Sequence, residues 1–245
     1  MNAAMVANPG GFLGARGLLR LPGPGTGVAA YGCGFSEGRF NAGLFAEYGI
    51  AEPDVISRSV PRRRAQYLAG RICARQTLRS LSEAAADGQL PIAADRRPMW
   101  PAGFTGSISH CAGMAVAVAC PKGRARGIGV DVEYVLEDQV WREIGESVTH
   151  GSDAAFLASA SEPLGIAVAR TVLFSAKESF FKSAFGMVGR VFDFDALSLV
   201  GLDADAGTAT AVVNLDLCPE VRRMDEVGIG FSAVDGLVAT WCILD

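Results

Sequence analysis

The sequence predicts an α+β protein made of a pseudo-two-fold pair of similar lobes. In each lobe a long helix packs on a small antiparallel sheet. Each half carries one long segment of helical periodicity, at residues 62–86 and 164–185, beside short apolar segments bounded by turn residues. The halves share this order of elements although no residue-level repeat is visible. We therefore expect an N-terminal lobe at 1–125, a C-terminal lobe at 126–245, and a ligand-binding cleft between them.

The composition is that of a soluble globular protein. Half of the 245 residues are hydrophobic, 20% are charged, and the formal net charge is −4, which argues against a nucleic-acid binder that relies on a basic surface. No secretory signal is visible at the N-terminus. The longest apolar run, at 112–120, is too short to cross a bilayer. We expect a cytoplasmic protein with no nucleic-acid or membrane partner.

The N-terminal lobe begins with a leader at 1–25 that is rich in Gly, Ala and Pro, so we expect it to be loosely ordered. Residues 27–34 can form a strand. The helix at 62–86 follows Pro61 and has leucines and an isoleucine at helical spacing.

Arginines mark the polar side of this helix. Arg64, Arg71 and Arg75 follow one another at steps of seven and four, so they share one stripe, and Arg63 adjoins its start. The helix has no acid before Glu83, which indicates arginines available to an anion. A solvated charged face is the alternative interpretation.

A proline-punctuated loop at 95–101 precedes two predicted strands, 104–109 and 114–120, which read as a hairpin with residues 110–113 at its turn. His110 lies in that turn, directly after two serines. A histidine of this kind is a binding candidate, although most such histidines are structural or merely exposed.

Residues 127–133 form a glycine-led strand with two acids. Because successive side chains of a strand point to opposite faces, Asp131 and Glu133 share one face while Val130 and Val132 share the other. Two carboxylates roughly 7 Å apart along a strand can converge on a hard divalent ion such as Mg²⁺. An edge strand with solvated acids is the alternative.

The C-terminal lobe continues with helices at 136–147 and 153–160, and its long helix starts at the helix-start signature Ser161-Glu162-Pro163. The few charged residues in the second half of the long helix are Lys177, Glu178 and Lys182. Glu178 and Lys182 are one turn apart and can face one ligand, or form an ordinary exposed pair. Four strands in an antiparallel meander are predicted at 191–200, 208–217, 228–234 and 237–243.

Together, these polar groups describe a site for a phosphorylated ligand with Mg²⁺. Four segments then resemble one family in order and spacing. The sequence is similar to the 4′-phosphopantetheinyl transferases, in particular to the single-chain, two-lobed branch that includes enterobactin synthetase component D. The matching segments are residues 62–71, 107–110, 129–133 and 174–182, and the likeness spans about residues 50 to 200.

The resemblance implies that phosphopantetheine moves from coenzyme A to a serine hydroxyl of an apo acyl or peptidyl carrier protein, with release of 3′,5′-adenosine bisphosphate. It also implies a monomer, and it leaves open whether the carrier serves fatty acid, polyketide, nonribosomal peptide or siderophore synthesis. Two alternatives remain: a non-catalytic module that binds coenzyme A or the carrier, and a Mg²⁺-dependent hydrolase.

The resemblance also implies site residues. The Mg²⁺ ligands would be Asp131, Glu133 and Glu178, and Glu178 would take the serine proton. Val132, between the two acids, cannot bind metal, which fits three carboxylates plus water. The implied coenzyme A contacts are Lys177 and Lys182 at the pyrophosphate and leaving group, Ser109 and His110 at the pyrophosphate, Arg63 and Arg71 at the 3′-phosphate, and Arg97 beside the adenine.

Overall fold

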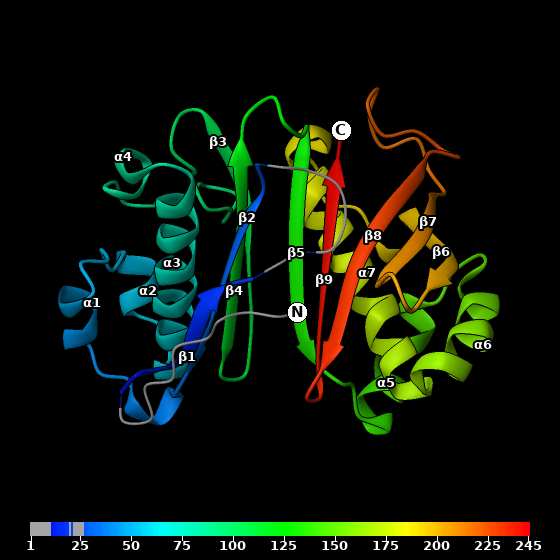
Figure 1. Ribbon diagram of the computed structural model, residues 1–245, viewed down its shortest axis with the longest axis horizontal. Helices are drawn as coiled ribbons and strands as arrows, with labels where there is room; N and C mark the ends of the chain where they lie inside the picture. Colours follow the sequence, from blue (N-terminus) through cyan, green and yellow to red (C-terminus); the bar gives the residue numbers. More distant parts are fainter. Residues whose placement is uncertain (1–10, 20, 22–26) are drawn as a thin grey trace. The chain divides into compact units, whose positions relative to one another are not determined.

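The computed structural model describes residues 11–19, 21 and 27–245. These fall into two compact units, one formed by described residues 11–19 and 27–124, the other by residue 21 together with 125–245. Each unit contains one long helix on an antiparallel sheet (Figure 1), so the predicted α+β class is confirmed. The pseudo-two-fold relation and the cleft stay predictions.

The first unit is a four-stranded antiparallel sheet in the order β1-β2-β4-β3, with helix α3 (Pro61–Leu81) packed on it (Figure 1). The strands are β1 (Leu13–Leu18), β2 (Ala29–Phe35), β3 (Phe104–Cys111) and β4 (Met114–Pro121). The short helices are η1 (Glu37–Arg39), α1 (Gly43–Glu47), α2 (Asp54–Ser57) and α4 (Glu83–Ala86).

Helix α3 forms where the periodicity predicts it, with Pro61 in its first turn and buried Leu68, Ile72 and Leu78 facing the sheet. It is shorter than expected. Ser82 has an extended backbone with φ of −164°, so the chain leaves α3 there and starts the separate helix α4.

Two further expectations for the first unit are corrected. Residues 13–18 of the expected loose leader form strand β1, which pairs with β2 and buries Leu13 in the core; residues 1–10, 20 and 22–25 lie outside the described residues. His110 belongs to strand β3, not to the turn, because β3 and β4 pair as far as Cys111 and Met114.

The second unit is a five-stranded antiparallel sheet in the order β5-β9-β8-β7-β6, with α7 (Ile166–Val188) lying along β5 and β9 (Figure 1). Its strands are β5 (Gly127–Tyr134), β6 (Leu197–Asp203), β7 (Thr208–Val213), β8 (Glu226–Val234) and β9 (Leu237–Leu244). The remaining helices are α5 (Asp138–Val148), α6 (Asp153–Leu164) and η2 (Phe194–Ala196).

The boundary between α6 and α7 differs from the expected helix start. Pro163 lies in the last turn of α6. Gly165, with φ of 77°, ends this helix, and α7 begins at Ile166. Only glycine adopts this backbone conformation readily. The strand expected at 191–200 likewise begins later, at Leu197, after the turn of η2.

The glycines that lead β5 allow α7 to lie directly on this strand. A Cβ at Gly129 would stand 1.9 Å from the carbonyl oxygen of Ser179, and one at Gly127 would stand 2.0 Å from that of Ser183. Since Cβ atoms do not approach a backbone oxygen so closely, any larger residue would push the helix off the strand. The glycines therefore set the distance between β5 and α7, the two elements that carry the candidate acids.

We expect Gly129→Ala to destabilise the second unit by about 3 kcal/mol, because the overlap is with rigid backbone and not with a movable side chain. Urea denaturation measures this loss. Gly228→Ala is the matched control, since Gly228 is also a strand glycine of this unit and a Cβ there meets nothing within 4 Å. Equal stability of the two variants would contradict the close contact between α7 and β5.

None of the helices in the part of the chain that the structure describes has the length and apolar character that a membrane crossing requires.

Candidate active site

Three carboxylates of the second unit come from two elements: Asp131 and Glu133 from β5, and Glu178 from α7. Asp131 is only 2% exposed. One of its oxygens accepts a hydrogen bond from Ser175 Oγ at 2.8 Å, and the other lies 2.7 Å from the Nζ of Lys182. Strand β5 and helix α7 thus place an acid, a hydroxyl and an ammonium in direct contact.

The electrostatics join the other two acids to this group. The pKa of Glu133 is raised to about 7, mainly by burial, with the charges of Asp131 and Glu178 adding to the rise and the charge of Lys182 opposing it. Burial also raises the pKa of Glu178, with Lys182 opposing and Asp131 adding to the rise. Asp131 and Lys182 are therefore in contact, and Glu133 and Glu178 interact electrostatically with both of them.

The chemistry of these donors fits a hard divalent cation, since Mg²⁺ prefers carboxylate oxygens and crowded carboxylates gain from added positive charge. Across the described ranges, however, no group of three or more His, Cys, Asp or Glu side chains is arranged to hold a metal ion. Asp131 instead binds Lys182. The three acids fit the ion in kind, and Asp131 is paired with an ammonium in its place.

Lys177 lies in the interior of the second unit. Its side chain is 1% exposed, and its ammonium contacts the carboxylate of Asp153 at 2.5 Å and the carbonyl oxygens of Val148 and Phe194 at 2.7 and 2.9 Å. The ammonium therefore joins α7 to α5, α6 and η2 inside the unit. In this arrangement the ammonium has a structural partner in Asp153, and the pyrophosphate role of Lys177 stays a prediction.

The first unit carries a second group of candidate residues. Arg63, exposed in the first turn of α3, has Nη1 2.9 Å from Nε2 of His110 on β3. Because a guanidinium can only donate, this histidine nitrogen accepts the hydrogen bond. Arg63 and His110, 47 residues apart in sequence, thus form one polar pair.

Arg71 is a buried cation close to this pair. It is 8% exposed, its Nε donates to the carbonyl oxygen of Leu90 at 2.9 Å, and its guanidinium lies 4.5 Å from the centre of the Tyr67 ring. Burial lowers its pKa, Tyr67 opposes this, and the charge of Arg63 lowers it further. No acid of the described chain lies within ion-pair distance of Arg71. Two like charges without an acid favour an anion.

Two arginines of the predicted stripe, Arg64 and Arg75, have partners within the first unit. Arg64 forms a two-point ion pair with Glu52, at 2.6 and 3.0 Å, and Arg75 donates to the carbonyl oxygens of Tyr48 and Gly49. These partners precede α3 in the sequence, whereas the expectation of free arginines considered only acids along the helix. The expectation is wrong for Arg64.

Arg97 and Ser109 complete the predicted set. Arg97 pairs with Asp95, two residues away in the same exposed loop, at 2.7 Å. Ser109 and His110 are consecutive residues of β3, so their side chains point to opposite faces of the sheet. The structure thus does not place them as a side-by-side pair.

Two residues that sequence reasoning did not single out contribute to these networks. Ser175 donates a hydrogen bond to Asp131. The sequence pattern that could have indicated this residue is the row of serines spaced by four along α7, which faces the two glycines of β5. Asp153 accepts from Lys177 and from the backbone N–H groups of His150 and Leu199 while fully buried. No local pattern marks that role.

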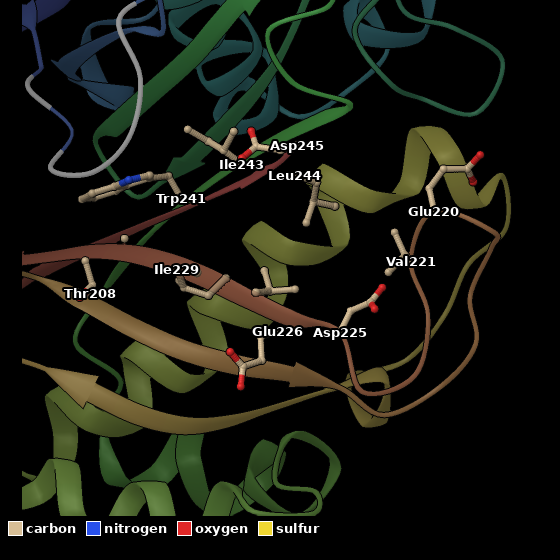
Figure 2. Close-up of a pocket in the computed structure, with 13 residues that line it drawn as sticks. Thr208, Glu220, Val221, Asp225, Glu226, Ile229, Trp241, Ile243, Leu244 and Asp245 are labelled. Atoms are coloured by element: carbon tan, nitrogen blue, oxygen red, sulfur yellow. The ribbon is translucent and has the colours of Figure 1, made fainter.

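One pocket of the second unit lies beside strands β8 and β9. It has a volume of about 480 Å³ and is lined by β8, β9 and the segment before β8, with Trp241 and Ile243 on β9 and Glu220, Asp225 and Glu226 nearby (Figure 2). None of the candidate site residues lines it. A second pocket of about 230 Å³ is lined by Lys177 and Glu178 among mainly apolar neighbours.

Comparison with known families matches both units. Residues 51–120 match the model of the 4′-phosphopantetheinyl transferase N-terminal domain, and residues 127–229 match that of the 4′-phosphopantetheinyl transferase superfamily.

Individual proteins are similar over most of the chain. Enterobactin synthase component D of Salmonella typhi is 35% identical over 67% of this chain and 68% of its own length. The 4′-phosphopantetheinyl transferase Svp of Streptomyces mobaraensis is 35% identical over 76% of this chain and 74% of its own. The 4′-phosphopantetheinyl transferase Npt of Nocardia iowensis is 30% identical over 65% of this chain and 71% of its own.

Proposed function

The chain belongs to the 4′-phosphopantetheinyl transferase superfamily, whose members transfer phosphopantetheine to carrier proteins, and on this basis we propose the reaction in detail. The donor is coenzyme A, the acceptor is a serine hydroxyl of an apo acyl or peptidyl carrier protein, and the reaction depends on Mg²⁺ and releases 3′,5′-adenosine bisphosphate. The protein acts as a monomer in the cytoplasm.

One observation carries this proposal: Asp131 contacts the ammonium of Lys182 inside the second unit, and the charges of Asp131 and Lys182 act on both Glu133 and Glu178. Asp131, Glu133 and Glu178 would hold Mg²⁺. When bound, the ion would supply positive charge to the pyrophosphate as the phosphoryl bond breaks.

Glu178 is proposed as the general base. A serine hydroxyl is a weak nucleophile, and a positioned carboxylate that takes its proton raises its reactivity. Burial raises the pKa of Glu178 above its ordinary value, and a carboxylate of higher pKa is a stronger base at neutral pH. Lys182, one turn along the same helix, is proposed to stabilise charge on the pyrophosphate.

The first unit is proposed to bind the nucleotide end of coenzyme A. Arg63 and Arg71 carry like charges that repel one another, and a bound anion would relieve this repulsion. This supports a role for both residues at the 3′-phosphate. His110, bonded to Arg63, is proposed at the pyrophosphate. Ser109, whose side chain points to the other face of β3, is assigned there by the family resemblance alone. Arg97 is proposed beside the adenine.

The test is incubation of the protein with coenzyme A, Mg²⁺ and a panel of apo carrier proteins, read by intact mass. Because several relatives are named enterobactin synthase component D, we propose a siderophore-type peptidyl carrier as the first acceptor. The expected result is a mass gain of one phosphopantetheinyl group that is abolished by a chelator. Binding of coenzyme A without any mass gain would support the non-catalytic module. Cleavage of coenzyme A without carrier would support the hydrolase.

We expect Arg63→Ala to weaken coenzyme A binding about tenfold while leaving 3′-dephospho-coenzyme A binding nearly unchanged, because one charge-assisted hydrogen bond contributes about 1.5–3 kcal/mol. Titration calorimetry measures both affinities. Arg62→Ala is the matched control, since Arg62 is the neighbouring exposed arginine and contacts Glu37. Equal losses for the two ligands would disconnect Arg63 from the 3′-phosphate.

A further inference from the structure

Lys182 contacts one acid of the second unit directly and acts electrostatically on two others. Its Nζ lies 2.7 Å from Oδ1 of Asp131, and its positive charge lowers the pKa of both Glu133 and Glu178. The ammonium therefore acts electrostatically on all three carboxylates to which the proposed function assigns the metal.

We propose that Lys182 is a tethered cation that holds the acid site together without metal, and that a divalent ion displaces its ammonium from Asp131. The displaced ammonium is then available to the phosphates of the substrate. This inference rests on the proposed function, because it takes the same acids as the metal site.

The burial of Asp131 supports this exchange. A carboxylate that is 2% exposed needs a positive partner or several hydrogen-bond donors. Ser175 supplies one donor, and Lys182 supplies the charge. A metal ion can replace that charge, but a metal ion and an ammonium repel each other at the same oxygen atoms. The two cations therefore compete for Asp131.

The partial exposure of the Lys182 side chain also supports the proposed exchange. The side chain is 25% exposed, so its ammonium has a path toward solvent, whereas Lys177 on the same helix is 1% exposed and bonded on all sides. A lysine ammonium sits on a flexible four-carbon chain and can move without any shift of the helix. Of the two lysines of α7, only Lys182 is placed to exchange.

Removal of the Lys182 charge is therefore expected to strengthen metal binding. Manganese ion is the probe, titrated into the protein without coenzyme A or carrier and followed by electron paramagnetic resonance. We expect Lys182→Gln, which retains a hydrogen-bond donor for Asp131, to bind the ion at least about tenfold more tightly than the unaltered protein. Lys182→Arg retains the charge and should bind as the unaltered protein does. Lys122→Gln, at an exposed lysine of the first unit, is the control.

A second measurement needs no variant of this site. The chain has three lysines, Lys122, Lys177 and Lys182, so the NMR signals of their terminal methylene groups can be assigned individually. Added Mg²⁺ should shift the Lys182 signal and leave those of Lys122 and Lys177 in place.

Unchanged or weaker manganese binding by Lys182→Gln would overturn the proposal, as would equal strengthening by Lys182→Arg. A Lys182 signal that does not respond to Mg²⁺ would also overturn it. None of these readouts uses phosphopantetheine transfer, so failure of the transfer assay and failure of the exchange are distinguished.

Discussion

Replacing Glu178 by glutamine is expected to lower kcat for phosphopantetheine transfer by about 10²–10⁴-fold, the contribution of a positioned general base. Glutamine has nearly the same shape, so the contact of α7 with β5, which is set by the glycines and not by Glu178, should survive. Binding of coenzyme A should persist too, because Arg63 and Arg71 in the first unit are unaltered.

Steady-state kinetics and calorimetry separate these effects, with circular dichroism to check the fold. Glu162→Gln is the matched control, since Glu162 is an exposed glutamate of the neighbouring helix α6 and its replacement should leave kcat unchanged. Turnover of Glu178→Gln at the rate of the unaltered protein would remove Glu178 both as base and as metal ligand.

Lys177→Met is expected to destabilise the second unit by about 3–5 kcal/mol, because it leaves the fully buried carboxylate of Asp153 without its cation. Asp153→Asn should cost a similar amount for the converse reason. The midpoint of urea denaturation measures both losses.

The control for this pair is Asp138→Asn. Asp138 pairs with Arg170 at 2.7 Å on the surface, where its side chain is 80% exposed, so its loss should cost less than about 1 kcal/mol. A Lys177→Met variant with unaltered stability and a large loss of kcat would support the catalytic role that the resemblance implied and contradict the structural one.

The sequence was informative about the acids because regular elements position them. The period of two in β5 places Asp131 and Glu133 on one face, and the spacing of four on α7 places Lys182 one turn from Glu178. What the periodicity does not contain is the distance between strand and helix, which depends on the close packing of Gly129 against Ser179.

Lys177 and Arg64 could not be assigned from the sequence because their partners lie far away along the chain. Lys177 binds Asp153, 24 residues earlier, and Arg64 binds Glu52, which precedes the helix in the sequence. Helical spacing indicates which residues share a face, but not what packs against that face. The motif that contains Lys177 and Lys182 thus combines a structural lysine with one at the acid site.

The expected boundaries of some helices and strands were wrong because local sequence signals are ambiguous. Proline is common in the first turn of a helix, so Pro163 predicted a helix start. In the structure Pro163 lies in the last turn of α6, and Gly165 ends that helix two residues later. Both residues are helix signals, and their order alone does not decide which one ends the element.

The most direct test of the acid site is a count of manganese ions bound per chain, measured for the unaltered protein and for Asp131→Asn, Glu133→Gln and Glu178→Gln. If β5 and α7 form one metal site, the unaltered protein binds one ion tightly and each substitution weakens that binding by at least about tenfold. A tight site that persists in the Glu178→Gln variant would show that the helix does not share a metal ion with the strand, and would contradict this account.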